Sequence, residues 1–470
     1  MEREEKALSR EKNLVKNTFV LALGRFLPKL VSVVTLPIIT GHLSKADFGT
    51  YDLITTLIMF LIPVATLQIQ SAAFRFLIDY RGNQKKSSEI ITNILVAVLL
   101  MTFLVSLIVF FVIPGLDMVN AALVSAYFFL DSLQNALSQI TRGLGGNKVF
   151  SVSSILVSFL NGLGIVLFIM GMDLGLFGVI MSLVIANLCA VIYLMVRMKL
   201  KDYIRLATLS GTTLKELLAY SWPMVPNNLS SWVLKLSDRV VILAFIGVEA
   251  NAVYAAANKV PNLLSVAQTV LLMAWQENAS LAVNDKDASE YYTKMFYRIF
   301  SLMIGFTAVL IAFTPAMFKL LIRGDYDEAY IQMPILILGM FFYCMSAFQG
   351  GIYIAHKKTK NVGISTMIAA LVNLAVDFAL IGVIGITAGS VSTLTAYMVL
   401  YVYRMINCQK FQTMNFKVKR QLLLLSVIVV MLILCFLRVF WIDVINCVFG
   451  ISFCFLLNRK NLRSLLHRKK

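Results

Sequence analysis

Apolar stretches of about 18 residues or more recur along the whole chain of 470 residues, and each could cross a hydrocarbon core about 30 Å thick. Inside such a core the backbone must satisfy its own hydrogen bonds, so repeated long apolar stretches favour helices. Hydrophobic residues make up 59% of the chain and charged residues 14%, with a mean hydropathy of +0.82. A soluble fold of this length could not bury that much apolar surface. The sequence therefore predicts an all-α polytopic membrane protein.

Charged residues and Gly- or Pro-rich breaks divide the apolar sequence into about fourteen predicted transmembrane helices. Their expected limits are residues 14–40, 48–78, 89–113, 120–141, 149–171, 174–196, 216–246, 249–283, 294–313, 331–355, 362–384, 386–407, 421–438 and 440–457. Several exceed the length that a straight span requires. Those that contain Pro28, Pro63, Pro223 or Pro261 are expected to tilt or kink.

Lysine and arginine are concentrated in alternate loops, which predicts the orientation of the chain. The termini and every second loop hold 32 of these residues, whereas the other loops hold four, Lys45, Lys319, Arg323 and Arg438. Because basic loops are retained in the cytoplasm, we expect a multi-pass protein of the cytoplasmic membrane with both termini cytoplasmic. The net charge of +18 then reflects topology and contact with anionic membrane lipids, and it requires no nucleic-acid partner.

The chain resembles itself at an offset of 203 residues, where Leu43–Tyr51 aligns without a gap with Ile246–Tyr254. Spans one to six and seven to twelve form two six-helix sets, so both sets enter the membrane from the same side, as parallel repeats do. We predict two pseudo-symmetric six-helix bundles followed by two further helices. The expected domains are an N-terminal lobe at 1–196, a cytoplasmic linker at 197–215, a C-terminal lobe at 216–407, two extra transmembrane helices at 421–457 and a basic cytoplasmic tail at 458–470.

Besides the basic residues counted with the termini and loops, which include Arg404 near the end of its span, six lie inside predicted spans. Each costs roughly 2.5–3.5 kcal/mol there on insertion scales unless it is paired or faces water. These candidate substrate-binding residues are Arg25, Lys29, Arg75, Lys235, Arg239 and Lys259. Arg25 and Lys29 are four residues apart on one helix face near mid-membrane, and Lys259 also lies deep in its span. For these three, a hydrated cavity and a neutralising carboxylate are both open interpretations.

The other three basic residues have simpler alternatives. Arg75 lies near the cytoplasmic end of its span, so its side chain could reach the membrane surface, although Gln68 and Ser71 continue a polar stripe with it. Lys235 is three residues before Asp238, which makes an ion pair within one helix an alternative to a binding role. Lys235 and Asp238 form a comparable polar stripe with Asn228 and Ser231, and Arg239 lies beside it.

Four acidic residues lie inside predicted spans and away from the span ends, namely Asp131, Asp238, Glu277 and Asp377. Each could carry a coupling proton or sodium ion, or could be a counterion for the basic set. Six basic against four acidic residues leave a net positive interior, which favours a phosphate-bearing substrate. We expect no cofactor and no metal site, because the three histidines lie in separate loops or the tail, and no phosphate-binding loop of ATPases occurs.

Several motifs together resemble the polysaccharide repeat-unit flippases (Wzx type) of the multidrug/oligosaccharidyl-lipid/polysaccharide exporter superfamily. The likeness is carried by Lys16–Thr18 through Leu36–Ile39, Leu43–Tyr51, Ala73–Phe76, Trp222–Asn227, Leu236–Arg239, and Gly247 with the Tyr254 segment. With the six-plus-six-plus-two layout it extends over nearly the whole chain, although the last two helices match only as hydrophobic spans.

The resemblance implies a MATE-like flippase that carries an undecaprenyl-diphosphate-linked oligosaccharide across the cytoplasmic membrane by alternating access, for surface polysaccharides such as O-antigen or capsule. It implies that cavity cations engage the diphosphate or acidic sugars, with Arg25, Arg75 and Arg239 at matching positions. Lys29, Lys235 and Lys259 depend on the burial argument alone. A polysaccharide polymerase and chain-length proteins are the expected partners of an otherwise monomeric transporter.

Three other functions remain open from the sequence. A peptidoglycan-precursor flippase would share the layout and charge, and an ion-coupled multidrug antiporter would share the fold but usually has acidic cavity residues for cationic drugs. A membrane glycosyltransferase or polymerase would be an enzyme rather than a transporter. Such enzymes commonly need a sizeable extracytoplasmic loop, and the longest one here, Thr314–Tyr330, is short.

Overall fold

The computed structural model is built from helices, and its described residues contain no strand, which confirms the all-α expectation. The structure describes residues 24, 26–112, 116–265, 268, 272, 275, 278–279, 282, 285, 287–356 and 358–467. The chain divides into two compact units, Met1–Leu229 (unit 1) and Ser230–Lys470 (unit 2). The division falls within helix α10 (Met224–Phe245).

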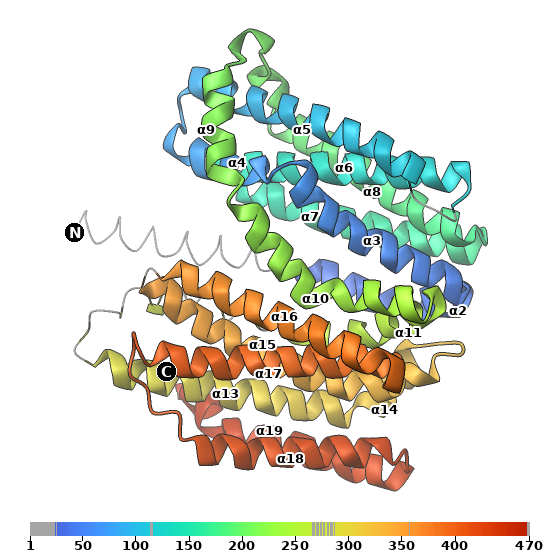
Figure 1. Ribbon diagram of the computed structural model, residues 1–470, viewed down its shortest axis with the longest axis vertical. Helices are drawn as coiled ribbons and strands as arrows, with labels where there is room; N and C mark the ends of the chain where they lie inside the picture. The colour runs from blue at the N-terminus through green and yellow to red at the C-terminus, as the bar shows by residue number, and fades with distance from the viewer. Residues whose placement is uncertain are drawn as a thin grey trace. The chain divides into compact units, whose positions relative to one another are not determined.

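Unit 1 is a bundle in which the long helices α5, α6 and α8 lie side by side, with α7 against α8 (Figure 1). Its helices are α2 (Leu36–His42), α3 (Lys45–Ala65), α4 (Ile69–Asp79), α5 (Gln84–Val112), α6 (Met118–Gly143), α7 (Asn147–Ile165), α8 (Gly175–Arg197) and α9 (Gly211–Ser221). A π-helical turn, η1 (Val166–Gly171), extends α7, and two 3-10 turns, η2 (Leu200–Tyr203) and η3 (Leu206–Thr208), precede α9. An apolar helix also leads into α2 within Phe26–His42.

An N-terminal cap and one glycine explain where α6 begins and how closely it packs in unit 1. Helix α6 begins after Asp117, whose carboxylate accepts the backbone N–H groups of Val119 and Asn120. These bonds and the Asn120 side chain lower the pKa of Asp117. At the other end of α6, a Cβ atom on Gly143 would lie 2.8 Å from Leu77 Cβ, so glycine permits the close packing of α6 on α4.

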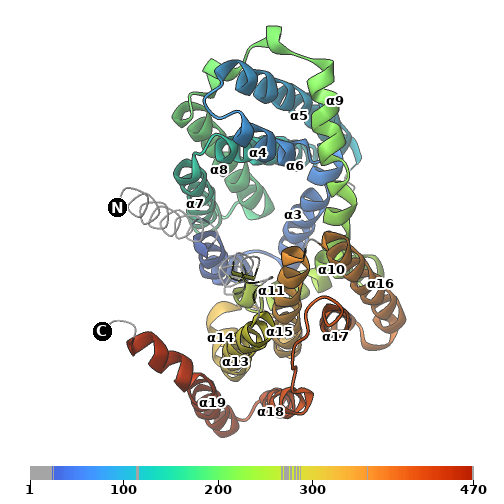
Figure 2. The same cartoon turned by 90° about the vertical axis from the view of Figure 1, so that its left-hand side faces the viewer.

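Unit 2 is centred on α15, which packs against α17, α13 and α11. Its helices are α10, α11 (Val248–Lys259), α13 (Ala288–Ala312), α14 (Thr314–Leu321), α15 (Asp327–Ala355), α16 (Thr359–Ile384), α17 (Thr387–Cys408), α18 (Val418–Phe436) and α19 (Phe440–His467). The last two helices lie at the margin of this unit, where α19 covers α13 (Figure 2). Their apolar outer surfaces suit contact with lipid.

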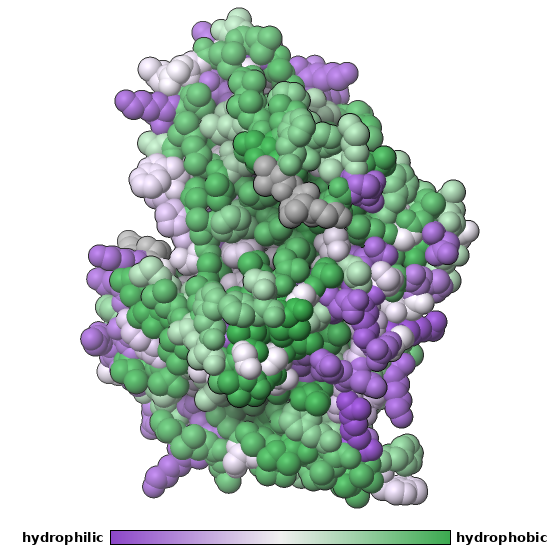
Figure 3. Space-filling model, turned by 45° about the vertical axis from the view of Figure 1, so that its right-hand side comes forward, coloured by the Kyte–Doolittle hydropathy of each residue, from purple (hydrophilic) through white to green (hydrophobic). Residues whose placement is uncertain are grey.

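Nine helices in the described part of the chain are long and apolar enough to cross a membrane. Apolar side chains cover most of the face seen in Figure 3, and hydrophilic side chains gather along its edges. The chain is thus a multi-pass membrane protein, while the expected number of about fourteen spans stays a prediction.

Three predicted spans are interrupted in the structure. Span 48–78 is divided into α3 and α4, because Leu67 and Gln68 take left-handed backbone conformations, with φ of 46° and 57°. Pro63 lies just before this break and lacks the N–H that would continue the helical hydrogen bonds. Span 216–246 is likewise α9 and α10, with Pro223 between them, and α11 ends at Lys259, two residues before Pro261.

Helix ends recur at the offset of the predicted repeat. Helix α2 ends at His42 and α10 ends at Phe245, which is 203 residues later. Helix α3 begins at Lys45 and α11 begins at Val248, again 203 residues later. The two aligned segments therefore occupy the same kind of helix-to-helix junction, although Ser44 caps one helix through its side chain and Gly247 precedes the other with φ of 131°.

Candidate functional site

A buried polar cluster in unit 2 is formed by α10, α11, α16 and α17, and its first member is Asp238. This residue is 1% exposed. Its Oδ2 atom accepts hydrogen bonds from the Tyr254 hydroxyl at 2.5 Å and from the Thr393 hydroxyl at 2.5 Å. The Tyr254 hydroxyl also lies 3.2 Å from the carbonyl oxygen of Gly389. Three helices of unit 2, α10, α11 and α17, thus meet at this carboxylate.

Asp377 on α16 is the second buried carboxylate, with no exposed surface, and it interacts directly with Asp238. Its Oδ1 atom accepts a hydrogen bond from Ser392 at 2.8 Å. The amide of Asn373, one turn before Asp377, links Ser392 to Ser237 on α10. Among the described residues, Asp238 Oδ1 and Asp377 Oδ2 have no hydrogen-bond partner. We call Asp238, Asp377, Asn373, Tyr254, Gly389, Ser392 and Thr393 the carboxylate cluster.

Glycine at position 389 allows the carboxylate cluster to close. A Cβ atom there would lie 3.0 Å from Tyr254 Cε2 and 3.1 Å from Ile242 Cδ1, closer than ordinary packing permits. Gly385, with φ of 58°, forms the short turn between α16 and α17, so that Asp377 and Ser392 face each other across this helical hairpin. The local sequence therefore positions the cluster through two glycines and a turn.

Arg239 is the one predicted substrate-binding residue whose side chain is both described and buried, at 7% exposure. Its charge acts on Tyr254 and Tyr397, so it lies beside the carboxylate cluster. The side chain of Lys235 lies outside the described part, and the predicted ion pair with Asp238 stays a prediction. The described contacts of Asp238 are with hydroxyl groups of α11 and α17 and with Asp377 of α16.

Arg75 forms an ion pair with Asp79, one turn further along α4, with 2.6 Å between Nη1 and Oδ2. Both side chains are about half exposed, at 53% and 54%. The other members of its predicted stripe bond to each other, since the Ser71 hydroxyl donates to Gln68 Oε1 at 2.8 Å. Within unit 1, Arg75 therefore has a local partner and an accessible side chain.

The remaining candidates are distributed over both units. Arg25 and Glu277 lie outside the described residues. Lys29 in unit 1 and Lys259 in unit 2 are half-buried, and each interacts with other residues of the protein. Asp131 on α6 is half-buried, and its carboxylate acts on the ring of Tyr127 one turn earlier. The structure therefore brings together Asp238, Asp377 and Arg239 of the ten predicted site residues.

Arg404 is a buried cation that the sequence analysis counted with a basic loop. It lies in α17 at 5% exposure. Its guanidinium donates to the Ser365 and Thr366 hydroxyls at 2.9 and 3.1 Å and to the Ser346 carbonyl oxygen at 2.8 Å. Its helical spacing from the buried residues Tyr397 and Tyr401 is the signal that could have revealed it.

Solved structures with the same fold are transporters. An inward-facing multidrug resistance MATE family transporter of the MOP superfamily matches with a TM-score of 0.71 and 14% identity, over 83% of this chain and 95% of that chain. The lipid II flippase MurJ matches with a TM-score of 0.73 and 15% identity, over 95% of this chain and 100% of that chain. A MOP superfamily transporter from Pyrococcus furiosus, described as having a binding pocket of reverse polarity, matches with a TM-score of 0.58 and 14% identity, over 84% of this chain and 95% of that chain. The fold is that of MOP superfamily transporters.

The family is shown by a sequence model. A model described as polysaccharide biosynthesis protein matches residues 14–276, which is more than half of the chain. The chain belongs to this polysaccharide biosynthesis family. A second model, described as MatE, matches residues 223–379. No curated protein matches the sequence.

Proposed function

We propose that this protein is a flippase that translocates a lipid (undecaprenyl)-diphosphate-linked oligosaccharide repeat unit across the cytoplasmic membrane for surface polysaccharide biosynthesis. The observation that carries the proposal is the polysaccharide biosynthesis model over residues 14–276 on a fold shared with a lipid II flippase. The fold match covers 95% of this chain for the lipid II flippase and 83% for the first MATE transporter. That difference favours a lipid-linked substrate over a drug.

The charge of the membrane interior supports an anionic substrate. Arg25, Lys29, Arg75, Lys235, Arg239 and Lys259 are the residues that we assign to the diphosphate or to acidic sugars. A diphosphate entering a low-dielectric region needs cationic or hydrogen-bonding partners, because an isolated buried charge is strongly disfavoured. Guanidinium groups suit this role through their paired donors, and lysines act as point charges.

We propose that the carboxylate cluster carries the coupling ion, a proton or a sodium ion. Asp238, Asp377 and the neighbouring Arg239 together have a net charge of −1, which one proton or one monovalent cation would balance. The cluster presents carboxylate, amide, hydroxyl and backbone carbonyl oxygens, the ligand type that hard cations prefer. The two carboxylates interact with each other, and one oxygen of each has no hydrogen-bond donor among the described residues, which supports a proton or cation shared between them.

The flipping assay tests the substrate class directly. The full-length protein is reconstituted into liposomes with a fluorescent undecaprenyl-diphosphate-linked oligosaccharide, and the label accessible from outside is followed after an ion gradient is imposed. We expect accessibility to equilibrate faster than in liposomes without protein, while the mass of the substrate stays unchanged. A change of mass would indicate an enzyme, and no acceleration with any lipid-linked oligosaccharide would reject the flippase.

A multidrug antiporter is the second candidate, because the MatE model matches residues 223–379. It predicts gradient-driven efflux of cationic dyes from the same liposomes and no flipping of the lipid-linked oligosaccharide. The two outcomes are measured on one preparation, so they separate the candidates.

A further inference from the structure

A cavity of about 450 Å³ lies in unit 1, where three segments distant in sequence meet. They are the turn before α5, the turn between α6 and α7, and the segment that follows α8. The volume is in the range of small-molecule pockets, roughly 300–1,000 Å³. None of the ten predicted site residues lines it.

The cavity has an apolar floor and a charged rim. Leu144, Met198 and Tyr203 form the floor, and all three are half-buried and pack against the hydrophobic core of unit 1. The charged residues of the lining are Arg81, Lys199 and Asp202, all of them exposed. The lining therefore has a net charge of +1 over an apolar surface, a combination that suits an amphiphile with an anionic head.

Arg81 is held in place while part of its guanidinium stays available. Its Nε atom donates to the Gly143 carbonyl oxygen at 2.7 Å, and Nη2 donates to the Arg142 carbonyl oxygen at 3.1 Å. Since a guanidinium has five N–H groups, three remain without a partner among the described residues. A guanidinium that is held by two of its N–H groups and has three left to donate is suited to binding a phosphate group.

Lys199 brings a second cation to the rim through an unusual backbone conformation. Its φ of 49° is left-handed, which is uncommon for a residue other than glycine, and it lies between α8 and η2 as the residue that precedes η2. The side chain makes no ion pair in the part of the chain that the structure describes.

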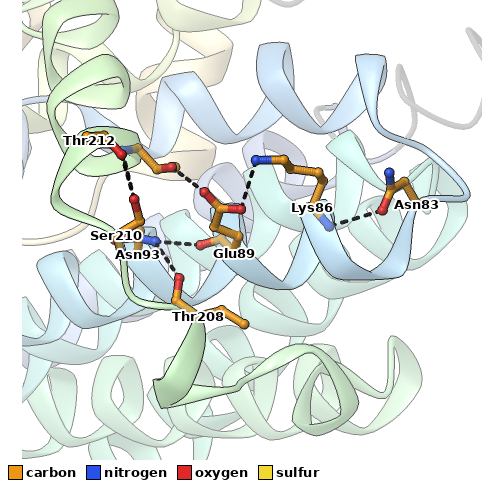
Figure 4. A network of polar contacts seen from close by, with 8 residues as sticks. Asn83, Lys86, Glu89, Asn93, Thr208, Ser210 and Thr212 are labelled. Atoms are coloured by element: carbon orange, nitrogen blue, oxygen red, sulfur yellow. Dashed lines mark hydrogen bonds and ion pairs between the residues drawn. The ribbon is translucent and has the colours of Figure 1, made fainter.

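The segment that carries Lys199 and Asp202 is fastened to α5. The Thr92 hydroxyl donates to the Tyr203 carbonyl oxygen at 3.2 Å and accepts the Arg205 N–H at 3.0 Å. The Asn93 side-chain amide likewise donates to the Thr208 carbonyl oxygen and accepts the Ser210 N–H. Asn93, Thr208 and Ser210 are drawn in Figure 4. The rim is therefore fixed before any ligand binds, which lowers the entropic cost of binding.

We propose that this cavity binds the phosphodiester headgroup of an anionic phospholipid such as phosphatidylglycerol. Arg81 and Lys199 bind the phosphate, Asp202 accepts hydrogen bonds from the glycerol hydroxyls, and the acyl chains leave along the apolar floor. The three segments belong to loops that the charge pattern assigns to the cytoplasmic side, so the lipid comes from the inner leaflet. The site is separate from transport, and its failure would leave the proposed function untouched.

The experiment measures lipid retained by the purified full-length protein. The protein is delipidated in detergent and titrated with phosphatidylglycerol, phosphatidylcholine or inorganic phosphate, and bound molecules are counted by native mass spectrometry. Arg81→Gln with Lys199→Gln is compared with Lys85→Gln with Lys201→Gln, a control that removes two exposed cations of the same segments that do not line the cavity. Lys199→Gln alone guards against misfolding, because the described structure gives its side chain no hydrogen bond.

We expect phosphatidylglycerol to bind more tightly than phosphatidylcholine and its affinity to fall roughly fivefold for each rim cation removed. The control pair should change it less than about twofold. Equal losses in both pairs would show diffuse surface attraction and overturn the proposal. Binding of inorganic phosphate without binding of phosphatidylglycerol would overturn the assignment to a lipid.

Discussion

Single side chains distinguish the carboxylate cluster of unit 2 from ordinary packing contacts. Asp238 and Asp377 lie together without exposed surface beyond 1%, and a buried carboxylate is tolerated only with charge balance or hydrogen bonds. Tyr254, Thr393 and Ser392 satisfy one oxygen of each. The second oxygen of each carboxylate is the part that a proton or cation would complete.

Replacing Asp238 or Asp377 with asparagine should weaken the dependence of flipping on the ion gradient. Removal of one charged ligand costs about 1.5–3 kcal/mol, which corresponds to roughly tenfold or more in cation affinity. Initial flipping rates in liposomes are measured against proton and sodium gradients. Asp173→Asn, which changes an exposed acid in a unit 1 turn, is the control. Unchanged gradient dependence in both single variants and in the double variant would remove the cluster from coupling.

Among the elements, the segment between α8 and α9 is attached to α5 by several hydrogen bonds. Its turns η2 and η3 are bonded to Thr92 and Asn93 of α5, and the Thr213 hydroxyl donates to Glu89. Figure 4 shows Asn93 and Glu89 beside this segment. Lys86 pairs with the same carboxylate at 3.0 Å. The segment is thereby part of unit 1, and it fixes the start of α9.

Thr92→Val should loosen this segment while α5 remains helical. The substitution keeps the shape of the side chain but leaves the Arg205 N–H and the Tyr203 carbonyl oxygen without their partner, at a cost of about 1–3 kcal/mol. Amide hydrogen exchange should rise in residues 200–210. Thr102→Val is the matched control, since its hydroxyl bonds only to Val98 within α5. Equal exchange in the two variants would contradict the role of Thr92.

For the whole molecule, the excess of membrane cations is the property that links composition to transport. Lys29 is half-buried within an apolar helix, where a lysine is costly unless it has a function or a partner. Arg25 lies four residues earlier on the same predicted face. A role in diphosphate binding requires the charge itself, whereas a role in packing requires mainly the aliphatic part of the side chain.

Lys29→Ala should abolish surface polysaccharide export in cells whose own flippase has been deleted and replaced by this protein. Protein level in the membrane should stay near normal, and Lys29→Arg should restore part of the export because it keeps the charge. Export is measured by surface labelling of the polysaccharide, with Lys85→Ala as an exposed control. Loss of the protein from the membrane together with loss of export would instead assign Lys29 to folding. Arg25→Ala is tested in parallel.

The sequence alone determined that this chain is a bundle of membrane helices. The length and hydropathy of each apolar stretch can be read locally, and a stretch that crosses a lipid bilayer must satisfy its own backbone hydrogen bonds as a helix. It also placed the junction of the repeat, where His42 and Phe245 end equivalent helices. It selected Asp238, Asp377 and Arg239, since charge inside an apolar span is visible without a fold.

Only the tertiary structure decided which of these residues meet. Asp238 and Asp377 are separated by many residues along the chain. The α16–α17 hairpin, which turns at Gly385, places Asp377 opposite Ser392, and the absence of a side chain at Gly389 leaves room for Tyr254, which bonds to Asp238. The break at Leu67 and Gln68 and the neutral acceptors around Arg404 likewise depend on backbone torsion and on neighbouring helices. Hydropathy measures how much a segment gains from leaving water, and it carries no information on which side chains then share the interior.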